Sequence, residues 1–295
     1  MDDNINTLQA HMPCLYVVAT PIGNLSDLSP RARDTLAQVR CIAAEDTRVT
    51  AHLLQHFGIQ TSMISMHRHN EAQKAEGFVA RMIEENFDAA LVCDAGTPTL
   101  SDPGHLLVAE AVAAGITVQP IAGPSAVAAA LSISGFDARE FAFYGFLPRE
   151  TGDLRKKLLA IARGVRVGVL YESPHRVTDL MACVAETLPG CRACVCCDLT
   201  KRYEKTLRGE AAAVLAELRE NPKTNKGEYC VVLDFEQVAL PEVVQAPAVS
   251  LETRLLGLLF EGMERAEALE RVIAEGARPN EAKRAMLKVR DFLER

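Results

Sequence analysis

Two short segments of this 295-residue chain bring acidic and basic side chains together in patterns that support chemistry. In the first segment, Glu45, Asp46 and Arg48 follow an apolar run and precede a helical pattern. The carboxylates offer acceptors for proton transfer, and the arginine offers a two-pronged contact for a phosphate. The same residues are also typical of a helix N-terminus, where Asp46 or Thr47 caps the helix. Residue types alone leave both interpretations open.

The second pattern consists of two short groups of residues, each at the end of a predicted strand in the second half of the chain. Asp198-Leu199-Thr200-Lys201 ends one apolar run, and Lys226-Gly227-Glu228 precedes another. A lysine beside a cationic ligand would have a lowered pKa and could accept a proton. An ordinary ion pair at the strand ends explains the same residues, so this alternative also stays open.

Four glycine- and proline-bearing loops follow apolar strands in the first half of the chain. They are Ala19 to Leu25, Asp94 to Pro98, Ser101 to Gly104 and Ala122 to Ala126. Loops at the carboxyl ends of strands in an open α/β sheet bind ligands, and glycine lets the backbone approach a ligand closely. Neither the dinucleotide fingerprint nor the P-loop spacing is present. We therefore expect a nucleotide-like ligand held by a different set of loops.

The periodicity of apolar residues predicts an α/β protein with two α/β domains and a helical tail. The domains are expected at 13–123 and 124–240, with the ligand cleft between them, and the helical extension at 248–295 after a linker at 241–247. The first set of strands predicts a largely parallel sheet covered on both faces. The predicted strands are 14–19, 39–43, 62–66, 88–93, 116–120, 141–145, 166–171, 193–199, 204–208 and 227–235. The predicted helices are 30–38, 48–57, 70–86, 104–114, 124–134, 153–163, 174–188 and 210–220.

Composition narrows the class of protein. The N-terminus leads into no apolar signal region and no membrane span is evident, so we expect a cytoplasmic protein whose nine cysteines are free thiols. The run from Cys191 to Cys197 has one C-x-x-C spacing but no second pair, which favours a buried strand over a metal site. His52 and His56 are four residues apart on a predicted helix, and surface histidines are the simpler interpretation. No metal is therefore expected.

Basic residues gather in three stretches although the net charge is −7. These stretches are 149–166, 201–208 and 283–290. Each alone is most often a solvated face, but three in one acidic chain favour a phosphate-rich partner.

Taken together, the motifs resemble one family. They are LYVVATPIGNL at 15–25, AAEDTR at 43–48, LLQHFGI at 53–59, DAGTP at 94–98, DPG at 102–104, GPS at 123–125, YGFLP at 144–148, YES at 171–173 with His175 and Arg176, and KGE at 226–228. In order and spacing they are similar to the bacterial ribosomal RNA small subunit methyltransferase I family, within the tetrapyrrole methylase superfamily. The resemblance implies two α/β domains of that type, with S-adenosylmethionine folded into the cleft between them. It further implies 2′-O-methylation of a cytidine in the decoding region of 16S ribosomal RNA, and a homodimer that acts on the small ribosomal subunit.

The resemblance assigns residues to the cofactor only where the motifs match. The implied cofactor-binding residues are Pro21, Gly23, Leu25, Asp94, Gly96, Thr97, Pro98, Asp102, Ser125, Ala126, Tyr144 and Leu147. The chain departs from the common pattern at Asp198, where the family usually has glutamate, and at Cys93, where it usually has serine. The shorter carboxylate leaves the role of Asp198 open.

The implied reaction gives roles to the two reactive segments. A ribose hydroxyl is a weak nucleophile, so a group that removes its proton or orients it should matter. Lys201, Glu45 and Asp46 are the candidates for that task, and Arg48 is the candidate for holding a phosphate. Three other functions compete: a methylase of the same fold that acts on a small tetrapyrrole or a protein, a non-catalytic factor that binds cofactor and RNA, and a nicotinamide dehydrogenase. The missing glycine fingerprint weakens the last of these.

Overall fold

The computed structural model describes residues 12–240 and 250–293, which belong to two compact units. The first unit runs to Leu240 and contains two sheets with their helices, and the second contains three helices. The predicted linker at 241–247 lies outside the described residues. A boundary at residue 123 between two α/β domains stays a prediction, since both sheets belong to one unit.

The first sheet is entirely parallel, as predicted. Its strands are β1 (Cys14–Val18), β2 (Cys41–Ala44), β3 (Ser62–Ser65), β4 (Ala89–Val92) and β5 (Thr117–Ile121), in the order β3-β2-β4-β1-β5. Every residue of β2 and β4 is buried, because helices cover both faces of the sheet. All five carboxyl ends therefore meet at one edge, where the following loops gather.

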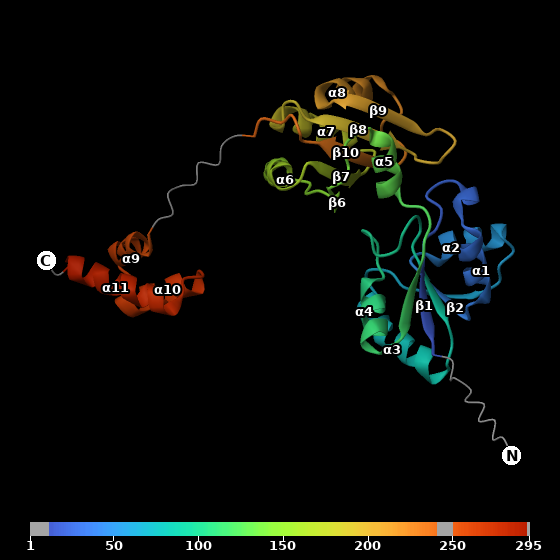
Figure 1. Ribbon diagram of the computed structural model, residues 1–295, viewed down its shortest axis with the longest axis horizontal. Coiled ribbons are helices and arrows are strands. Elements are labelled where there is room, and N and C mark those ends of the chain that lie inside the picture. Colours follow the sequence, from blue (N-terminus) through green and yellow to red (C-terminus); the bar gives the residue numbers. More distant parts are fainter. Residues whose placement is uncertain (1–11, 241–249, 294–295) are drawn as a thin grey trace, which may run out of the picture. The chain divides into compact units, whose positions relative to one another are not determined.

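Four helices form the two outer layers of this sheet (Figure 1). They are α1 (Pro30–Gln38), α2 (Thr47–His56), α3 (Glu71–Glu84) and α4 (His105–Ala113). Leu36 of α1 and Leu54 of α2 pack in the core on one face, and Phe78 of α3 and Leu107 of α4 pack in the core on the other. Helix α1 begins where the sequence predicts, because the Ser29 hydroxyl accepts a hydrogen bond from the Ala32 N–H and Pro30 starts the helix.

The second sheet is mixed. Its strands are β6 (Phe141–Phe146), β7 (Val167–Glu172), β8 (Arg192–Cys197), β9 (Lys205–Glu210) and β10 (Tyr229–Asp234), in the order β6-β7-β10-β8-β9. Strand β6 pairs with β7 in parallel, and the other pairs are antiparallel. Strand β8 is the buried cysteine strand that the sequence predicts, with the Sγ atoms of Cys194 and Cys196 3.8 Å apart.

Helices again cover both faces of the second sheet. On one face lie α6 (Thr151–Gly164), α7 (Val177–Thr187) and α8 (Ala211–Glu220). On the other lies α5 (Ala126–Ser134), together with Ile22 from the loop after β1. A loop of the first sheet thus enters the core of the second, which is why the two sheets form one unit.

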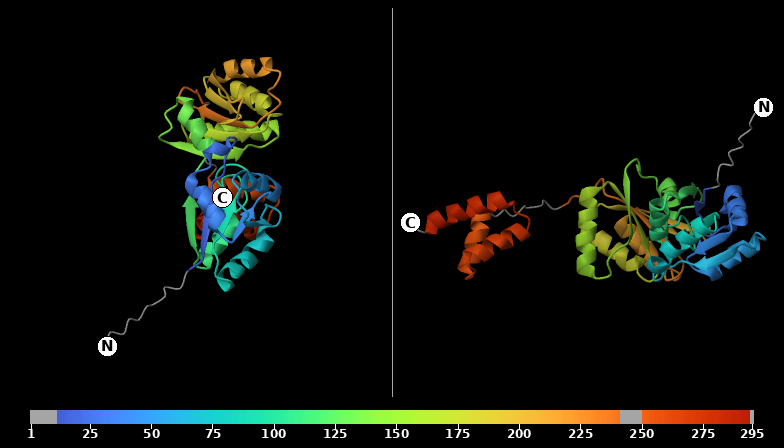
Figure 2. Two further views of the ribbon diagram at one scale, coloured as in Figure 1. Left: turned by 90° about the vertical axis from the view of Figure 1, so that its right-hand side faces the viewer. Right: turned by 90° about the horizontal axis from the view of Figure 1, so that it is seen from below.

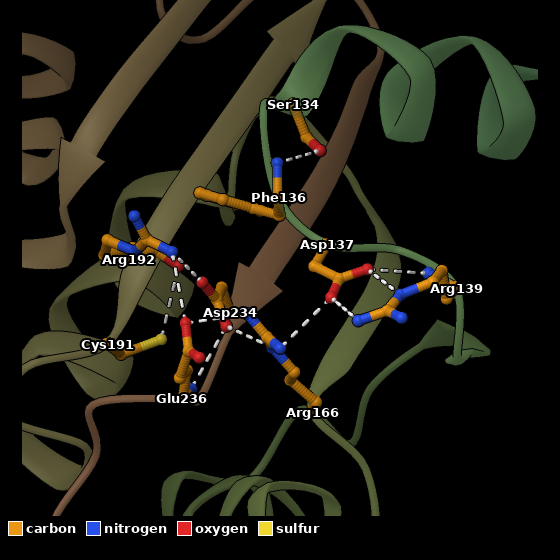
Figure 3. A network of polar contacts seen from close by, with 9 residues as sticks. All are labelled: Ser134, Phe136, Asp137, Arg139, Arg166, Cys191, Arg192, Asp234 and Glu236. Atoms are coloured by element: carbon orange, nitrogen blue, oxygen red, sulfur yellow. Dashed lines mark hydrogen bonds and ion pairs between the residues drawn. The ribbon is translucent and has the colours of Figure 1, made fainter.

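A network of ion pairs closes the end of the second sheet at Asp234 (Figure 3). The buried carboxylate of Asp234 pairs with Arg192, and its Oδ1 lies 3.9 Å from Nε of Arg166. Arg166 also pairs with Asp137 and Glu236. Because Asp234 and Tyr229 are at opposite ends of β10, this network stabilises the end of the sheet that lies away from Tyr229.

The second unit is the helical extension that the sequence predicts, shown in red in Figure 2. Its helices are α9 (Leu251–Phe260), α10 (Arg265–Ala274) and α11 (Pro279–Leu293). They pack around a small core that includes Leu255, Val272 and Val289. Within residues 12–240 and 250–293, no helix is both long and apolar enough to cross a membrane.

One buried carboxylate fixes the loop between β4 and α4. Glu71 begins α3, and its Oε1 accepts hydrogen bonds from the N–H groups of Gly104, Leu106 and Leu107, at 2.9, 2.7 and 3.3 Å. These are among the amides at the start of α4 that have no partner within the helix. Glu71 therefore caps α4 from a neighbouring helix.

We expect Glu71→Ala to lower the free energy of unfolding by roughly 2–3 kcal/mol, because buried N–H groups lose their acceptor. Glu76→Ala removes an exposed carboxylate from the same helix and should change stability by less than about 0.5 kcal/mol. Denaturant unfolding of both variants measures the difference. Equal stability of the two would show that Glu71 does not hold the loop.

Candidate active site

A cavity of about 330 Å³ lies among the loops of the two sheets. Five residues that the resemblance assigns to the cofactor line it: Gly96, Thr97, Asp102, Ser125 and Ala126. Others were not assigned to the ligand by the sequence, and these include Ile22, Leu100, Phe146, Tyr171, Glu172 and Tyr229. The cavity therefore draws on the carboxyl-end loops of β1, β4 and β5 and on residues of the second sheet.

The loop after β4 has an unusual backbone. Gly96 has a φ of +90°, and its N–H and C=O exchange hydrogen bonds with Thr20 of the loop after β1, at 3.1 and 2.8 Å. Thr99 and Ser101 both have a φ of +72°, a left-handed conformation that costs free energy in a residue other than glycine. Asp94 is exposed and Pro98 is buried, and both lie in this loop beside the residues that line the cavity.

Two glycines mark the points where the loops of the two sheets touch. A Cβ on Gly23 would lie 2.4 Å from Cγ of Lys201 and 2.9 Å from the carbonyl oxygen of Leu199. A Cβ on Gly145 would lie 2.6 Å from Oγ of Ser101. At Gly23 the contact with the Leu199 backbone excludes a larger residue unless that loop shifts, whereas at Gly145 the Ser101 side chain would have to move.

The first loop contributes less to the cavity wall than the resemblance implies. Of the residues that the structure describes, Ile22 lines the cavity, while Pro21 and Gly23 flank it in sequence. Leu25 starts a short 3₁₀ helix, Leu25–Asp27, and its side chain is 40% exposed. Gly23 lies in contact with Lys201. A contact between the cofactor and Pro21, Gly23 or Leu25 stays a prediction.

A bulge in β6 changes which aromatic side chain reaches the cavity. The register with β7 shifts between Phe143 and Phe146, at Gly145, whose φ is +60°. Leu147 is consequently buried in the core of the second sheet, with Tyr144 packed against that core, and Phe146 lines the cavity. The sequence motif locates the right segment, but the bulge cannot be read from it.

Three carboxylates gather at the edge of the cavity. The Asp94 N–H donates to Oε2 of Glu45 at 3.4 Å, and Asp102 lines the cavity. Burial raises the pKa of Glu45, and the negative charges of Asp102 and Asp94 raise it further. Burial likewise raises the pKa values of Asp94 and Asp102. Such a group binds protons more readily than an isolated carboxylate and suits a cationic ligand.

Asp46 and Arg48 are held differently. Asp46 caps α2, because its Oδ1 accepts the Arg48 N–H at 2.8 Å. The Arg48 guanidinium also contacts both carboxylate oxygens, at 3.0 and 2.6 Å, and this hydrogen bonding lowers the pKa of Asp46 to about 2. The capping interpretation of this segment is therefore confirmed. Asp46 is a weak base, while the Arg48 side chain remains 87% exposed.

Lys201 lies between two acidic partners. Its Nζ donates to Oδ1 of Asp198 at 3.1 Å and to Oε2 of Glu228 at 2.9 Å. Burial alone would lower the pKa of Lys201, but the hydrogen bonds to Glu228 and Asp198 raise it overall. The expected lowering is therefore absent in this state. Lys201 is a cation here and cannot accept a proton.

The remaining sequence candidates lie at the surface or in ion pairs. His52 and His56 are exposed on α2, as expected. In the basic stretch 149–166, Arg155 pairs with Glu186 and Lys156 with Asp153, which lowers the net positive charge offered to a phosphate. Among the described residues, no three histidine, cysteine, aspartate or glutamate side chains form a group that could hold a metal.

Comparison with known proteins decides the family. Residues 14–215 match the family of tetrapyrrole (corrin/porphyrin) methylases. The ribosomal RNA small subunit methyltransferase I of Xylella fastidiosa (strain Temecula1 / ATCC 700964) is 44% identical over 220 residues, which cover 74% of this chain and 80% of that protein. The protein of the same name from Synechocystis sp. is 41% identical over 272 residues, covering 91% and 95%. The chain belongs to the ribosomal RNA small subunit methyltransferase I family.

Solved structures give this methyltransferase I family member the same fold. Diphthine synthase has a TM-score of 0.59 at 13% identity, with 77% of this chain and 91% of that chain covered. The methyltransferase CobJ has a TM-score of 0.54 at 18% identity, with 75% and 94% covered. A uroporphyrin-III C-methyltransferase from Thermus thermophilus, complexed with S-adenosyl homocysteine, has a TM-score of 0.53 at 16% identity, with 75% and 97% covered. The expected fold type is thereby confirmed.

We expect Gly23→Ala to lower the free energy of unfolding by about 1–3 kcal/mol, because the new methyl group overlaps Lys201 and Leu199. Gly77→Ala is the matched control, since a Cβ there meets nothing within 4 Å and the site is in helix α3. That variant should be more stable than the wild type by roughly 0.5–1 kcal/mol. Denaturant titrations compare the two, and a stable Gly23→Ala variant would contradict the close contact.

Proposed function

We propose that this protein transfers a methyl group from S-adenosylmethionine to the 2′-hydroxyl of a cytidine in the decoding region of 16S ribosomal RNA. Membership of the family, together with a cavity at the carboxyl ends of β1, β4 and β5, carries the proposal. In its general form, the proposal is that this protein methylates ribosomal RNA. The position of the methyl group and the identity of the nucleotide are its finer form.

The residues of the cavity suit S-adenosylmethionine. The cofactor carries a sulfonium and an ammonium group, and Asp102 and Glu228 place acidic groups in the lining. Gly96 brings bare backbone to the wall, and Phe146 and Tyr171 add aromatic surface for an adenine ring. When bound, the cofactor supplies an electrophilic methyl group. The chain's part is to align that group with the attacking oxygen.

Among the candidate bases, Glu45 fits the task best. Its raised pKa brings it nearer to neutral pH, where a carboxylate is a more effective proton acceptor. Asp46 is unsuited because its pKa is lowered to about 2. Lys201, which is protonated, would orient the hydroxyl or hold a phosphate, and the exposed Arg48 would hold a second phosphate.

The nucleic-acid partner must be recognised by charge and by its ribose. A 2′-hydroxyl distinguishes RNA from DNA, and a nucleotide must leave its helix to enter a cavity. The stretch 149–166, which includes helix α6, and the stretch 283–290 in helix α11 are the proposed phosphate contacts. The protein acts as a homodimer on the small ribosomal subunit in this proposal.

The function is tested with labelled S-adenosylmethionine and small subunits from a strain that lacks this protein. We expect one modified nucleoside, identified by mass as 2′-O-methylcytidine, at a single site in 16S ribosomal RNA. Incorporation into another nucleoside would overturn the finer proposal and leave the general one. Cofactor binding without incorporation into any ribosomal RNA would overturn the substrate.

Lys201→Ala is expected to lower turnover by about 10- to 100-fold without weakening the binding of the cofactor. Lys201→Met keeps the methylene groups that pack on Gly23 and removes only the charge, so it should lower turnover comparably. Lys223→Ala removes an exposed lysine elsewhere as a control. Single-turnover rates and calorimetry separate the two effects. A wild-type rate in Lys201→Met would remove Lys201 from the mechanism.

A further inference from the structure

The short connection between β8 and β9 carries a highly exposed aromatic side chain. Tyr203 is 77% exposed, more than any other large hydrophobic residue described between residues 12 and 240. It belongs to none of the hydrophobic cores of the described residues, so packing does not account for an aromatic residue at this position. The neighbouring Arg202 is also exposed, and its Cζ lies 5.5 Å from the centroid of the Tyr203 ring.

The connection forms a turn that hydrogen bonds hold in place. The Glu204 N–H donates to the Lys201 carbonyl at 3.1 Å, which closes a turn with Arg202 and Tyr203 at its tip. The Thr200 N–H donates to Oε2 of Glu204 at 2.6 Å. Thr200 itself has a φ of +64°, a conformation that a β-branched residue adopts only where its surroundings impose it. The ring and the guanidinium are therefore presented from a fixed backbone.

This turn begins at the wall of the cavity. Leu199 lines the cavity, and Lys201 lies against Gly23 in the loop after β1. Tyr203 is four residues beyond Leu199, so its Cα lies within about 14 Å of that wall. Tyr203 is not itself part of the lining. The turn thus lies beside the cavity, where it can contact a long substrate whose reacting part is inside.

The basic side chains at this turn have no acidic partner. Arg202 and Lys205 are exposed, and neither forms an ion pair within residues 12–240 and 250–293. The acids nearby are already engaged, because Glu204 accepts a backbone N–H and two others hold Lys201. An exposed aromatic ring with cations beside it is typical of a surface that binds single-stranded nucleic acid, since bases stack on the ring and phosphates meet the cations.

We propose that the turn 201–204 docks the RNA strand beside the target nucleotide, with Tyr203 stacked on the base of a neighbouring nucleotide. Arg202 and Lys205 hold the phosphates that flank this base. This inference rests on the proposed function and adds a contact separate from the stretches 149–166 and 283–290. Stacking on a fixed ring stabilises a base that has left its helix, so the strand stays open while the target ribose occupies the cavity.

Replacement of Tyr203 separates RNA docking from methyl transfer. Methylation rates at graded concentrations of small subunits should give Tyr203→Ala a KM for subunits raised by about 10- to 100-fold, with kcat and calorimetric affinity for S-adenosylhomocysteine unchanged. Tyr203→Phe keeps the stacking surface and should bring KM back to within about threefold of the wild type. Phe141→Ala is the control, because it removes a 47% exposed ring at the end of the second sheet that lies away from Tyr229. Thermal melts confirm folding.

The charges are tested through salt dependence. Single-stranded nucleic acid gives a slope of log affinity against log salt of about 0.7 for each phosphate neutralised. A variant with both Arg202→Ala and Lys205→Ala should therefore show a slope of log KM against log salt that is lower by about 1.4. Arg219→Ala, which removes an exposed arginine of α8, should leave the slope unchanged.

Photo-cross-linking identifies the partner. With p-benzoylphenylalanine in place of Tyr203, irradiation on the small subunit should give cross-links to nucleotides next to the methylated one. Cross-links to ribosomal protein alone would overturn the inference. So would a wild-type KM in folded Tyr203→Ala, or a KM in Tyr203→Phe as high as in Tyr203→Ala. None of these results affects the proposed function while the wild type methylates the subunits. Loss of that methylation in the wild type would overturn the proposed function, and this inference with it.

Discussion

The site depends on two places where the loops of the two sheets meet without side chains. Gly23 in the loop after β1 lies against Lys201, and Gly145 in the bulge of β6 lies against Ser101. A Cβ at Gly23 would require the loop of Leu199 to move, and a Cβ at Gly145 would require the Ser101 side chain to move. The cavity is lined by residues of both sheets, and these two contacts lie between the loops that carry some of those residues. Ser101, which lies against Gly145, itself has a positive φ.

The electrostatics of the site follow from which charges already have partners. Asp46 is neutralised by Arg48, and Asp234 by Arg192 and Arg166, so these acids are ordinary structural groups. The cavity retains acidic groups of another kind. Asp102 lies among other carboxylates, and its raised pKa records the cost of burying it there. A cationic ligand would lower the free-energy cost of burying Asp102, so an acidic lining suits a cavity that binds a cation.

The sequence predicts the elements well, and several of the loops that it assigns to a ligand line the cavity. Strong apolar periodicity and capping residues such as Ser29 act locally, so strands and helices are found within a few residues of their predicted bounds. The cavity wall is harder to predict. Leu147 is buried in the core of the second sheet beside a bulge that changes the register of β6, so its assigned contact with the cofactor stays a prediction. The turn that presents Tyr203 depends on the hydrogen bond between Thr200 and Glu204, and no pattern of residue types reports it.

The charge state of Lys201 links the cofactor to the reaction. In the structure described here, Glu228 and Asp198 raise the pKa of Lys201, and Glu228 also lines the cavity. A cation bound beside Glu228 would share that carboxylate and weaken its effect on the lysine, which lowers the pKa of Lys201. By thermodynamic reciprocity, a lysine that gives up its proton strengthens the binding of that cation. Burial of Lys201 acts in the same direction, since burial already favours the neutral amine. The raised pKa seen here and the lowered pKa expected beside a cationic ligand are therefore two states of one coupled equilibrium. A cation bound beside Glu228 would thus shift the protonation equilibrium of Lys201 through the Asp198–Lys201–Glu228 group.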